Sequence, residues 1–221
     1  MSETVPYPLL KWGTDKLLSL LLILIFTPVW IFIVFSMLIS MALFPADRGS
    51  LFYREKRITR GREFDILKFR VLRKDVLLQV QKEGKYSRLY EGDSSKLTWV
   101  GRCLLKKWYL DELPQLLNIF KGDMSLVGPR PLIVIEVNEL LKQGIMYRNY
   151  ILAGWTGPTQ VEVKGETIQK TAKELDLEYV DRCRNWSSWQ LWWYDINVLY
   201  QTIKIILSGP NKSLFEKKFC F

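Results

Sequence analysis

Hydrophobic and polar residues are distributed very unevenly along the 221-residue chain. From Leu17 to Leu43 no residue carries a charge, and most are leucine, isoleucine, valine, phenylalanine or methionine. Such a run exceeds the roughly 20 residues that a membrane-spanning helix needs. It ends in LFPADRGS, without the small-residue site at which a signal peptide is cleaved. The pattern therefore predicts a helix held in a membrane.

This segment can either cross the membrane once, as a simple anchor, or enter and return on the same side. Thr27-Pro28 lies near its middle, where proline removes a backbone hydrogen bond and favours a kink, while the threonine hydroxyl can bond a preceding carbonyl. Both flanks are basic, with Lys11 and Lys16 before the run and four Lys/Arg at 48–57 after it. A single span cannot keep both flanks cytoplasmic. We therefore favour a re-entrant, monotopic hairpin over residues 1–47, broken at Thr27-Pro28, with arms of about 11–16 residues.

Residues 48–221 have the mixed pattern of a globular domain, for which we expect an α/β fold that is mostly helical and irregular, with little sheet. LFYREKRI and REFDILKFRVL flank TRGRE and favour a short β-hairpin or irregular extended segments. LVGPRPL reads as an irregular turn, and AGWTGPTQVEVKGE as a loop with or without a strand. Helices are expected early in the polar segment 75–95, at Leu113–Phe120, at Leu132–Lys142 with Gly144 as its cap, and at Lys170–Val180.

The clearest helical periodicity lies near the C-terminal end, where apolar residues recur at spacings of three and four and predict an amphipathic helix. Packing against a core explains such a stripe in most soluble proteins. Beside a membrane segment, clustered tryptophan and tyrosine also suit an interfacial helix at the headgroup level. The stripe consists of Trp186, Trp189, Trp192, Trp193, Ile196, Leu199, Tyr200, Ile203, Ile206 and Leu207.

The amino-acid composition limits the catalytic mechanisms that are possible. The chain has no histidine, which excludes Ser-His, Cys-His and His-metal mechanisms, so catalysis would use carboxylates, lysines and arginines. Its scattered cysteines, Cys103, Cys183 and Cys220, fit a reduced compartment and argue against a disulfide framework or zinc site. The net charge of +9 is concentrated in residues 48–74, where ten Lys/Arg face three Asp/Glu. Such a region favours a phosphate-bearing partner, either nucleic acid, lipid headgroups or a phosphorylated substrate.

DELPQ, at residues 111–115, contains an acidic pair with two interpretations. Asp111 or Glu112 could cap a helix whose first turn tolerates Pro114. Alternatively, a carboxylate could attack a phosphate, which requires a divalent cation and nearby Lys/Arg. Suitable cations occur in the chain: Lys68 and Arg70 lie at i and i+2, Arg130 stands between two prolines, and Lys106 and Lys107 precede the pair.

The order KFR, LDELPQLLNIFKGDMSLVGPRPL and GPTQV, behind a hydrophobic segment broken at Thr-Pro, resembles the bacterial sugar transferases. These are monotopic polyprenol-phosphate phosphoglycosyl transferases, and the length resembles their small, catalytic-core members. The resemblance covers nearly the whole chain. It implies a Mg²⁺-dependent enzyme on the cytoplasmic face of the bacterial inner membrane. That enzyme would move a sugar-1-phosphate from a UDP-sugar to undecaprenyl phosphate, release UMP and so start a surface glycan.

The resemblance also implies roles for individual residues. Asp111 would attack the phosphate and hold a covalent phosphosugar, while Glu112, together with Asp111, would bind the metal. Lys106 stands where the family usually has arginine, and GPTQVEVK departs from the common G-W-A-Q-V-x-G-R, so that Lys164 replaces an arginine and loses its bidentate fork. The implied substrate-binding residues are Lys68, Arg70, Arg130, Arg54, Arg57, Lys106, Gln160 and Lys164.

The implied partners are the UDP-sugar, undecaprenyl phosphate and membrane lipid, without nucleic acid, and a homodimer is left open. An alternative function is a membrane-anchored basic protein that binds lipid or nucleic acid through residues 48–74 without catalysis. A catalytically inactive scaffold is a third hypothesis, against which the intact Asp111, Glu112, Lys68 and Arg130 argue.

Overall fold

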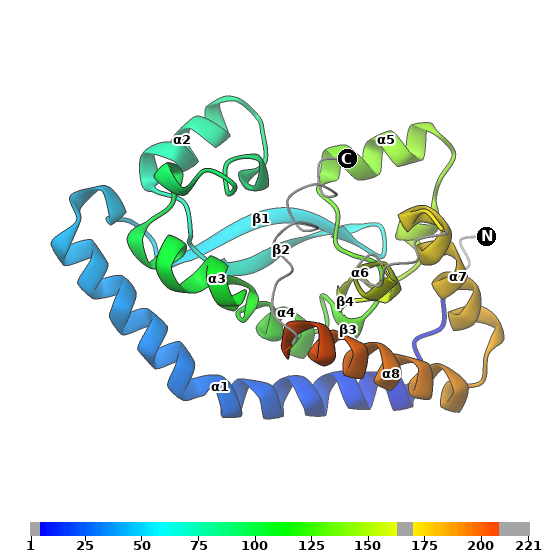
Figure 1. Cartoon of the computed structure of the whole chain (residues 1–221). Coiled ribbons are helices and arrows are strands. Elements are labelled where there is room, and N and C mark those ends of the chain that lie inside the picture. The colour runs from blue at the N-terminus through cyan, green and yellow to red at the C-terminus, as the bar shows by residue number, and fades with distance from the viewer. Residues whose placement is uncertain (1–4, 163–169, 208–221) are drawn as a thin grey trace. The chain divides into compact units, whose positions relative to one another are not determined.

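The computed structural model describes residues 5–162 and 170–207 (Figure 1). Over these residues the chain is mostly helical, with two small two-stranded sheets, which confirms the expected mixture of many helices and little sheet. The strands are β1 (Phe52–Thr59), β2 (Arg62–Phe69), β3 (Ser125–Val127) and β4 (Gly154–Thr156). The helices are α1 (Leu9–Leu43), α2 (Lys74–Lys82), α3 (Lys106–Trp108), α4 (Gln115–Lys121), α5 (Val134–Lys142), α6 (Pro158–Glu162), α7 (Ala172–Asn185) and α8 (Ser188–Leu207).

The chain divides into two compact units, each assembled from separate segments. The first unit takes Met1–Leu20, Lys56–Phe64 and Asn118–Phe221, and the second takes Leu21–Glu55 and Asp65–Leu117. Both units therefore use residues from either side of position 47, and the division into residues 1–47 and 48–221 stays a prediction.

Helix α1 is one uninterrupted helix of 35 residues that contains Pro28. As expected, the Thr27 hydroxyl donates a hydrogen bond to a preceding carbonyl, that of Ile23, at 2.8 Å. The helical structure does not stop at Thr27-Pro28, so the predicted helix–break–helix segment is not confirmed, and the re-entrant path stays a prediction. By length and composition α1 could cross a membrane, and only 11% of its most apolar stretch is buried.

In its first part, α1 buries its polar side. In the first unit Lys11, Asp15 and Ser19, spaced four residues apart, are buried, whereas Leu9 and Leu17 are 85% and 72% exposed. A helix of a soluble protein places its apolar face inward. The part of α1 that belongs to the second unit also exposes many large apolar side chains. These are Leu21, Leu24, Ile25, Ile31, Phe32, Phe35, Leu38, Ile39 and Leu43.

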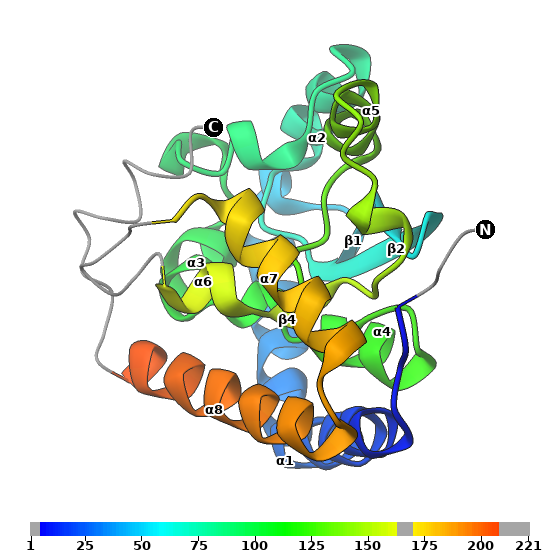
Figure 2. The same cartoon turned by 90° about the vertical axis from the view of Figure 1, so that its right-hand side faces the viewer.

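In the first unit, β3 and β4 pair in parallel, with Ser125 opposite Gly154 and Val127 opposite Thr156. The two backbone segments approach very closely where β3 ends and β4 begins. A Cβ added to Gly154 would lie 2.1 Å from the backbone nitrogen of Gly128. Helix α8 contacts both strands, and α6 contacts α7 and α8 (Figure 2). The sequence pattern did not predict β3 or α6, which occupy stretches interpreted there as an irregular turn and a loop.

In the second unit, the base of the β1–β2 hairpin packs against α1. The Phe69 ring, at the end of β2, contacts Trp30 of α1 edge to face at 6.0 Å and stacks on Phe52 of β1 at 5.3 Å. The hairpin is confirmed, and α2, α4, α5 and α7 lie within a few residues of the expected helices. Gly144 follows α5 with φ +74°, as its predicted role as a helix cap requires.

Candidate active site

The acidic pair lies on a short, irregular stretch of the second unit. A π-helical turn at Gly101–Leu105 leads into α3, and Tyr109 then adopts the left-handed conformation with φ 55° and ψ 24°. This conformation is uncommon for a bulky residue and is found preferentially at functional sites. It ends α3 and starts the 3₁₀ turn Leu110–Glu112, which carries both carboxylates.

Asp111 is only 1% exposed, and its two oxygens have different surroundings. Oδ2 lies 3.1 Å from the Lys106 ammonium, whereas Oδ1 is buried and has no hydrogen-bond partner. The carboxylate therefore does not cap α4, which begins at Gln115. Because a buried carboxylate oxygen without a partner is costly, Oδ1 is an atom that would gain from a ligand.

Lys106 bridges Asp111 and a third carboxylate, Glu91, whose Oε2 lies 2.6 Å from the ammonium. The other Glu91 oxygen accepts a hydrogen bond from the Ser87 hydroxyl at 3.2 Å. Sequence reasoning missed Glu91, because it stands in a polar stretch 20 residues before Asp111 and belongs to no motif that we recognised. No local signal could have found it.

Glu112 forms an ion pair with a different lysine. The Lys68 ammonium, from β2, lies 3.2 Å from Glu112 Oε1. The structure thus brings together four residues that the sequence singled out, Asp111, Glu112, Lys68 and Lys106, and adds Glu91 to them.

Charge and burial act against each other in this cluster. Burial raises the pKa of the Asp111 carboxyl, and Lys106 acts in the opposite direction. Burial alone would lower the pKa of Lys106, but Asp111 and Glu91 outweigh it and raise this pKa. Burial also acts to raise the pKa of Glu91, but Lys106 and Lys68 lower it overall. Lys106 is therefore held as an ammonium group beside two carboxylates, where it could also neutralise phosphate oxygens.

The cluster can accommodate Mg²⁺. No three Cys, Asp or Glu side chains converge into a metal cage within residues 5–162 and 170–207. However, Mg²⁺ at phosphate-transfer sites is commonly held by one or two carboxylates, with waters and substrate phosphates completing its shell. The neighbouring carboxylates of Glu112 and Asp111 are the two groups of this kind that the cluster offers.

Arg70, which was also expected to bind substrate, makes its contacts with the backbone instead of with this cluster. Its side chain is 1% exposed, and Nε and Nη1 donate to the carbonyls of Ser50 and Leu72 at 2.6 and 2.8 Å. Nη2 donates to the Asp47 carbonyl. A guanidinium whose three nitrogens each donate to a backbone carbonyl holds the loop around it, and the role of Arg70 in substrate binding stays a prediction.

The remaining predicted residues are divided between the two units. Arg54 is exposed on β1 in the second unit, whereas Arg130, Arg57 and Gln160 belong to the first unit. Arg57 Nη1 donates to the Pro131 carbonyl at 3.1 Å, and the buried Gln160 Oε1, on α6, has no partner. Lys164 lies outside the described residues.

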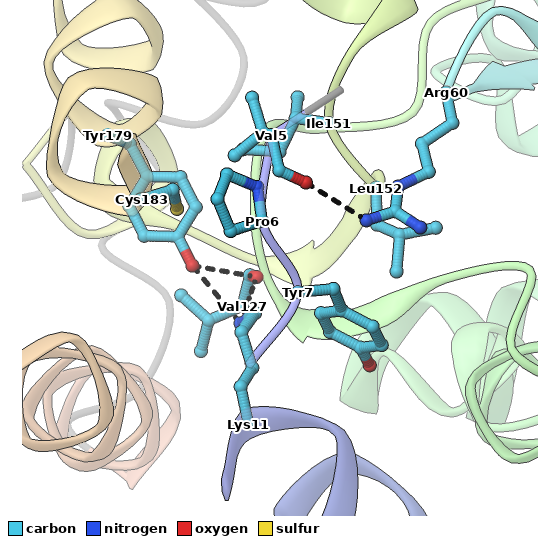
Figure 3. Close-up of a pocket in the computed structure, with 10 residues that line it drawn as sticks. All are labelled: Val5, Pro6, Tyr7, Lys11, Arg60, Val127, Ile151, Leu152, Tyr179 and Cys183. Atoms are coloured by element: carbon cyan, nitrogen blue, oxygen red, sulfur yellow. Dashed lines mark hydrogen bonds between the residues drawn. The ribbon is translucent and has the colours of Figure 1, made fainter. Parts of the chain in front are cut away.

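A second polar cluster, in the first unit, is buried around Lys11. Its ammonium lies 2.6 Å from Asp195 of α8 and donates to the Tyr179 hydroxyl and to the Val127 carbonyl of β3. Figure 3 shows Lys11 and Tyr179 converging on this carbonyl, beside a cavity of about 10 Å³. This volume approaches that of one water molecule, so the cavity is too small for a sugar nucleotide.

The residues of the site indicate a class of chemistry. A buried aspartate with one free oxygen, beside lysines in a chain without histidine, suits carboxylate chemistry on a phosphate. A comparison with protein families matches residues 7–209 to the bacterial sugar transferases. The chain belongs to this family.

Several relatives carry more detailed names. Undecaprenyl-phosphate galactose phosphotransferase of Salmonella typhimurium is 32% identical over 208 residues, covering 90% of this chain and 40% of that protein. UDP-glucose:undecaprenyl-phosphate glucose-1-phosphate transferase of Escherichia coli is 33% identical over 204 residues, covering 88% and 39%. Exopolysaccharide production protein ExoY of Rhizobium meliloti is 32% identical over 207 residues, covering 89% and 84%. The chain thus spans about two fifths of the first two relatives and most of the third.

Proposed function

We propose that the protein transfers a sugar-1-phosphate from a UDP-sugar to undecaprenyl phosphate and releases UMP. The observation that carries the proposal is the Asp111 carboxylate, buried with Oδ2 on Lys106 and Oδ1 unpartnered. Membership of the family and the names of the relatives give the reaction class. The glycan that the reaction would start is a bacterial surface polysaccharide or glycoprotein glycan.

The reaction would proceed in two displacements at the phosphorus that bears the sugar. First, Asp111 Oδ1 forms a bond to this phosphorus, the bond to the bridging oxygen breaks, and that oxygen leaves with UMP. Second, a phosphate oxygen of undecaprenyl phosphate attacks the same phosphorus and restores the free Asp111 carboxylate. The product is an undecaprenyl diphosphate sugar, and each displacement breaks one P–O bond and forms another.

Lys106 and Lys68 would offset the negative charge of the phosphate as it approaches a carboxylate. Bound Mg²⁺, held by Glu112 and Asp111, would supply Lewis-acid stabilisation of the phosphate oxygens. The family resemblance assigns Arg130 to the donor diphosphate, with Arg54, Arg57, Gln160 and Lys164 as further substrate contacts.

The acceptor is a lipid, and the exposed apolar surfaces support a membrane-bound enzyme. Most of the tryptophan-rich stripe of α8 is exposed, including Trp189, Trp193 and Tyr200 at 58%, 53% and 60%. Core packing therefore does not explain the stripe, and we propose that α8 lies at the membrane interface. We also propose that α1 enters and leaves the cytoplasmic leaflet of the inner membrane as a re-entrant segment.

The decisive experiment measures UMP release from a panel of UDP-sugars with undecaprenyl phosphate and Mg²⁺. The Asp111→Asn variant should lose activity by about 10³-fold or more, because the amide cannot form the acyl phosphate. Asp75→Asn, at an exposed aspartate paired with Arg73, is the matched control and should retain it. No UMP from any donor, or full activity of Asp111→Asn, contradicts the proposal. Salt-sensitive lipid or nucleic-acid binding without UMP release favours the non-catalytic alternative.

Topology is tested separately by placing a cysteine at residue 2 and labelling intact cells with a membrane-impermeant thiol reagent. A re-entrant α1 leaves this cysteine cytoplasmic and unlabelled. Labelling from the periplasm restores the single spanning anchor.

A further inference from the structure

The Pro-Arg-Pro segment of the first unit poses a structural problem. Pro129 and Pro131 have no N–H group, so the segment cannot be fixed through amide donors at these positions. It is fixed through its carbonyls instead. The Gly154 amide donates to the Pro129 carbonyl at 2.8 Å, and Arg57 Nη1 donates to the Pro131 carbonyl at 3.1 Å.

The middle carbonyl, that of Arg130 itself, accepts a hydrogen bond from Arg148 Nη1. Arg148 lies in the 3₁₀ turn Tyr147–Asn149 and is only 8% exposed. Three consecutive carbonyls around Arg130 are therefore held by donors that come from other parts of the first unit.

Arg148 is itself held in place. Its Nη2 lies 2.6 Å from Asp176 Oδ2 of α7, and the same oxygen accepts a hydrogen bond from the Tyr147 hydroxyl at 2.8 Å. The other Asp176 oxygen accepts from the Thr159 hydroxyl of α6 at 2.9 Å. A bidentate guanidinium suits this position because one nitrogen pairs with the carboxylate while another holds the carbonyl.

We infer that Arg148 is a positioning residue for the transfer reaction, fixing the backbone of Arg130 so that the Arg130 side chain meets the donor diphosphate. The inference rests on the proposed function, in which Arg130 contacts the donor. Arg148 itself need not touch substrate, because its nitrogens on Asp176 and on the Arg130 carbonyl are already engaged. The alternative is a purely structural role, in which the Arg148–Asp176 pair stabilises the first unit and has no specific effect on the donor.

A double-mutant cycle separates these roles. Arg148→Lys keeps the charge but loses the fork, so it cannot serve Asp176 and the Arg130 carbonyl together. KM for the UDP-sugar and kcat for UMP release are measured for this variant, for Arg130→Ala and for the double variant. Arg148→Lys should raise KM about tenfold with kcat changed less than about twofold. In the Arg130→Ala background the same substitution should have almost no further effect on KM.

Arg182→Lys is the matched control, because Arg182 is also on the first unit, lies over the Tyr194 ring and pairs with Glu178, away from the Pro-Arg-Pro segment. Its KM should stay unchanged. Thermal unfolding is recorded for every variant. Should Arg148→Lys not fold, Asp176→Asn replaces it, since it removes the charge that orients Arg148 and should raise KM in the same direction.

The outcomes are distinguishable. A KM that stays unchanged in Arg148→Lys, or that rises by the same factor with and without Arg130, overturns the positioning role. An Arg130→Ala variant with the wild-type KM overturns the donor contact on which the inference depends, even if UMP release persists. If the wild-type protein releases no UMP, the proposed function itself fails.

Discussion

Lys106 serves two carboxylates at once, and its shorter contact is with Glu91 rather than with Asp111. The ammonium is thereby held between the two groups and does not close fully onto Asp111, the nucleophile that we propose. An aspartate that forms a tight pair with one lysine is a weaker nucleophile, because the pair stabilises the carboxylate before attack. Glu91 therefore influences Asp111 although it does not touch it.

This gives a prediction for Glu91→Gln. With the glutamate charge removed, Lys106 should pair with Asp111 alone, and UMP release should fall about fivefold, which corresponds to about 1 kcal/mol. Initial rates at saturating donor measure the effect. Glu83→Gln, at an exposed glutamate of the same unit that pairs with Lys85, is the control. An unchanged rate in Glu91→Gln would show that Glu91 has no influence on the nucleophile.

For individual residues, the sequence identified those members of the cluster that stand in recognisable motifs. Asp111, Glu112, Lys68 and Lys106 all stand in motifs of the family, and the structure places them in one cluster. Arg70 stands in the same KFR motif but lies just beyond the end of β2 and turns into the core, which an i, i+2 argument for an extended chain could not foresee.

Among the elements, the close contact between Gly128 and Gly154 leaves no room for an added Cβ at either residue. It places the Pro-Arg-Pro segment directly against the start of β4, since the Gly154 amide donates a hydrogen bond to the Pro129 carbonyl. The three atoms nearest to a Cβ added at Gly154 all belong to the Gly128 backbone, which cannot rotate away as a side chain could.

Gly154→Ala should therefore destabilise the protein by about 2–3 kcal/mol, the cost of overpacking a rigid site. Chemical denaturation in detergent measures this difference. Gly92→Ala is the control, because nothing lies within 4 Å of its added Cβ. Equal stability of both variants would mean that the Gly128–Gly154 approach relaxes freely.

Helix α8 offers a prediction about the membrane interface. In a chain whose cysteines are replaced by serine, a spin label at Ile203→Cys should be accessible to oxygen in bilayers and protected from aqueous quenchers. A label at Asn197→Cys, an exposed polar position of the same helix, should show the opposite preference. Similar aqueous accessibility of the two labels would place α8 in solution.

Long, periodic helices were predictable because their signal accumulates over many residues. Strand β3 and helix α6 were not, because they have three and five residues and no periodicity can be read over such lengths. For α6, Pro158 at its first position was a usable signal of a helix start. We interpreted the Gly157-Pro158 pair as part of a loop instead.

For the whole molecule, the first part of α1 has a polarity inverted relative to that of a soluble helix. Its buried face carries Lys11, Asp15 and Ser19, whereas Leu9 and Leu17 are exposed. The sequence showed the apolar run but placed Lys11 in a basic flank facing the cytoplasm, because its partner Asp195 lies 184 positions away.

Lys11→Met should destabilise the folded protein by about 3–5 kcal/mol, because it leaves the buried Asp195 without its charge partner. The double variant Lys11→Met/Asp195→Leu removes both charges and should recover most of the loss. Denaturation of the three proteins in the same detergent compares them. A double variant as unstable as the single one would show that the ion pair itself, rather than the orphaned charge, stabilises the fold.

The separation of Lys11 from Asp195 also has a consequence for biosynthesis. At about 5–20 residues per second, a ribosome adds Asp195 roughly 9–37 s after Lys11. Throughout this interval the charge of Lys11 lacks the Asp195 carboxylate, and an unpaired lysine resists translocation across a membrane. On the re-entrant path that we propose, this side chain would hold the N-terminal end of the helix on the side of synthesis before α8 encloses it. Insertion and tertiary folding would then use one lysine in succession.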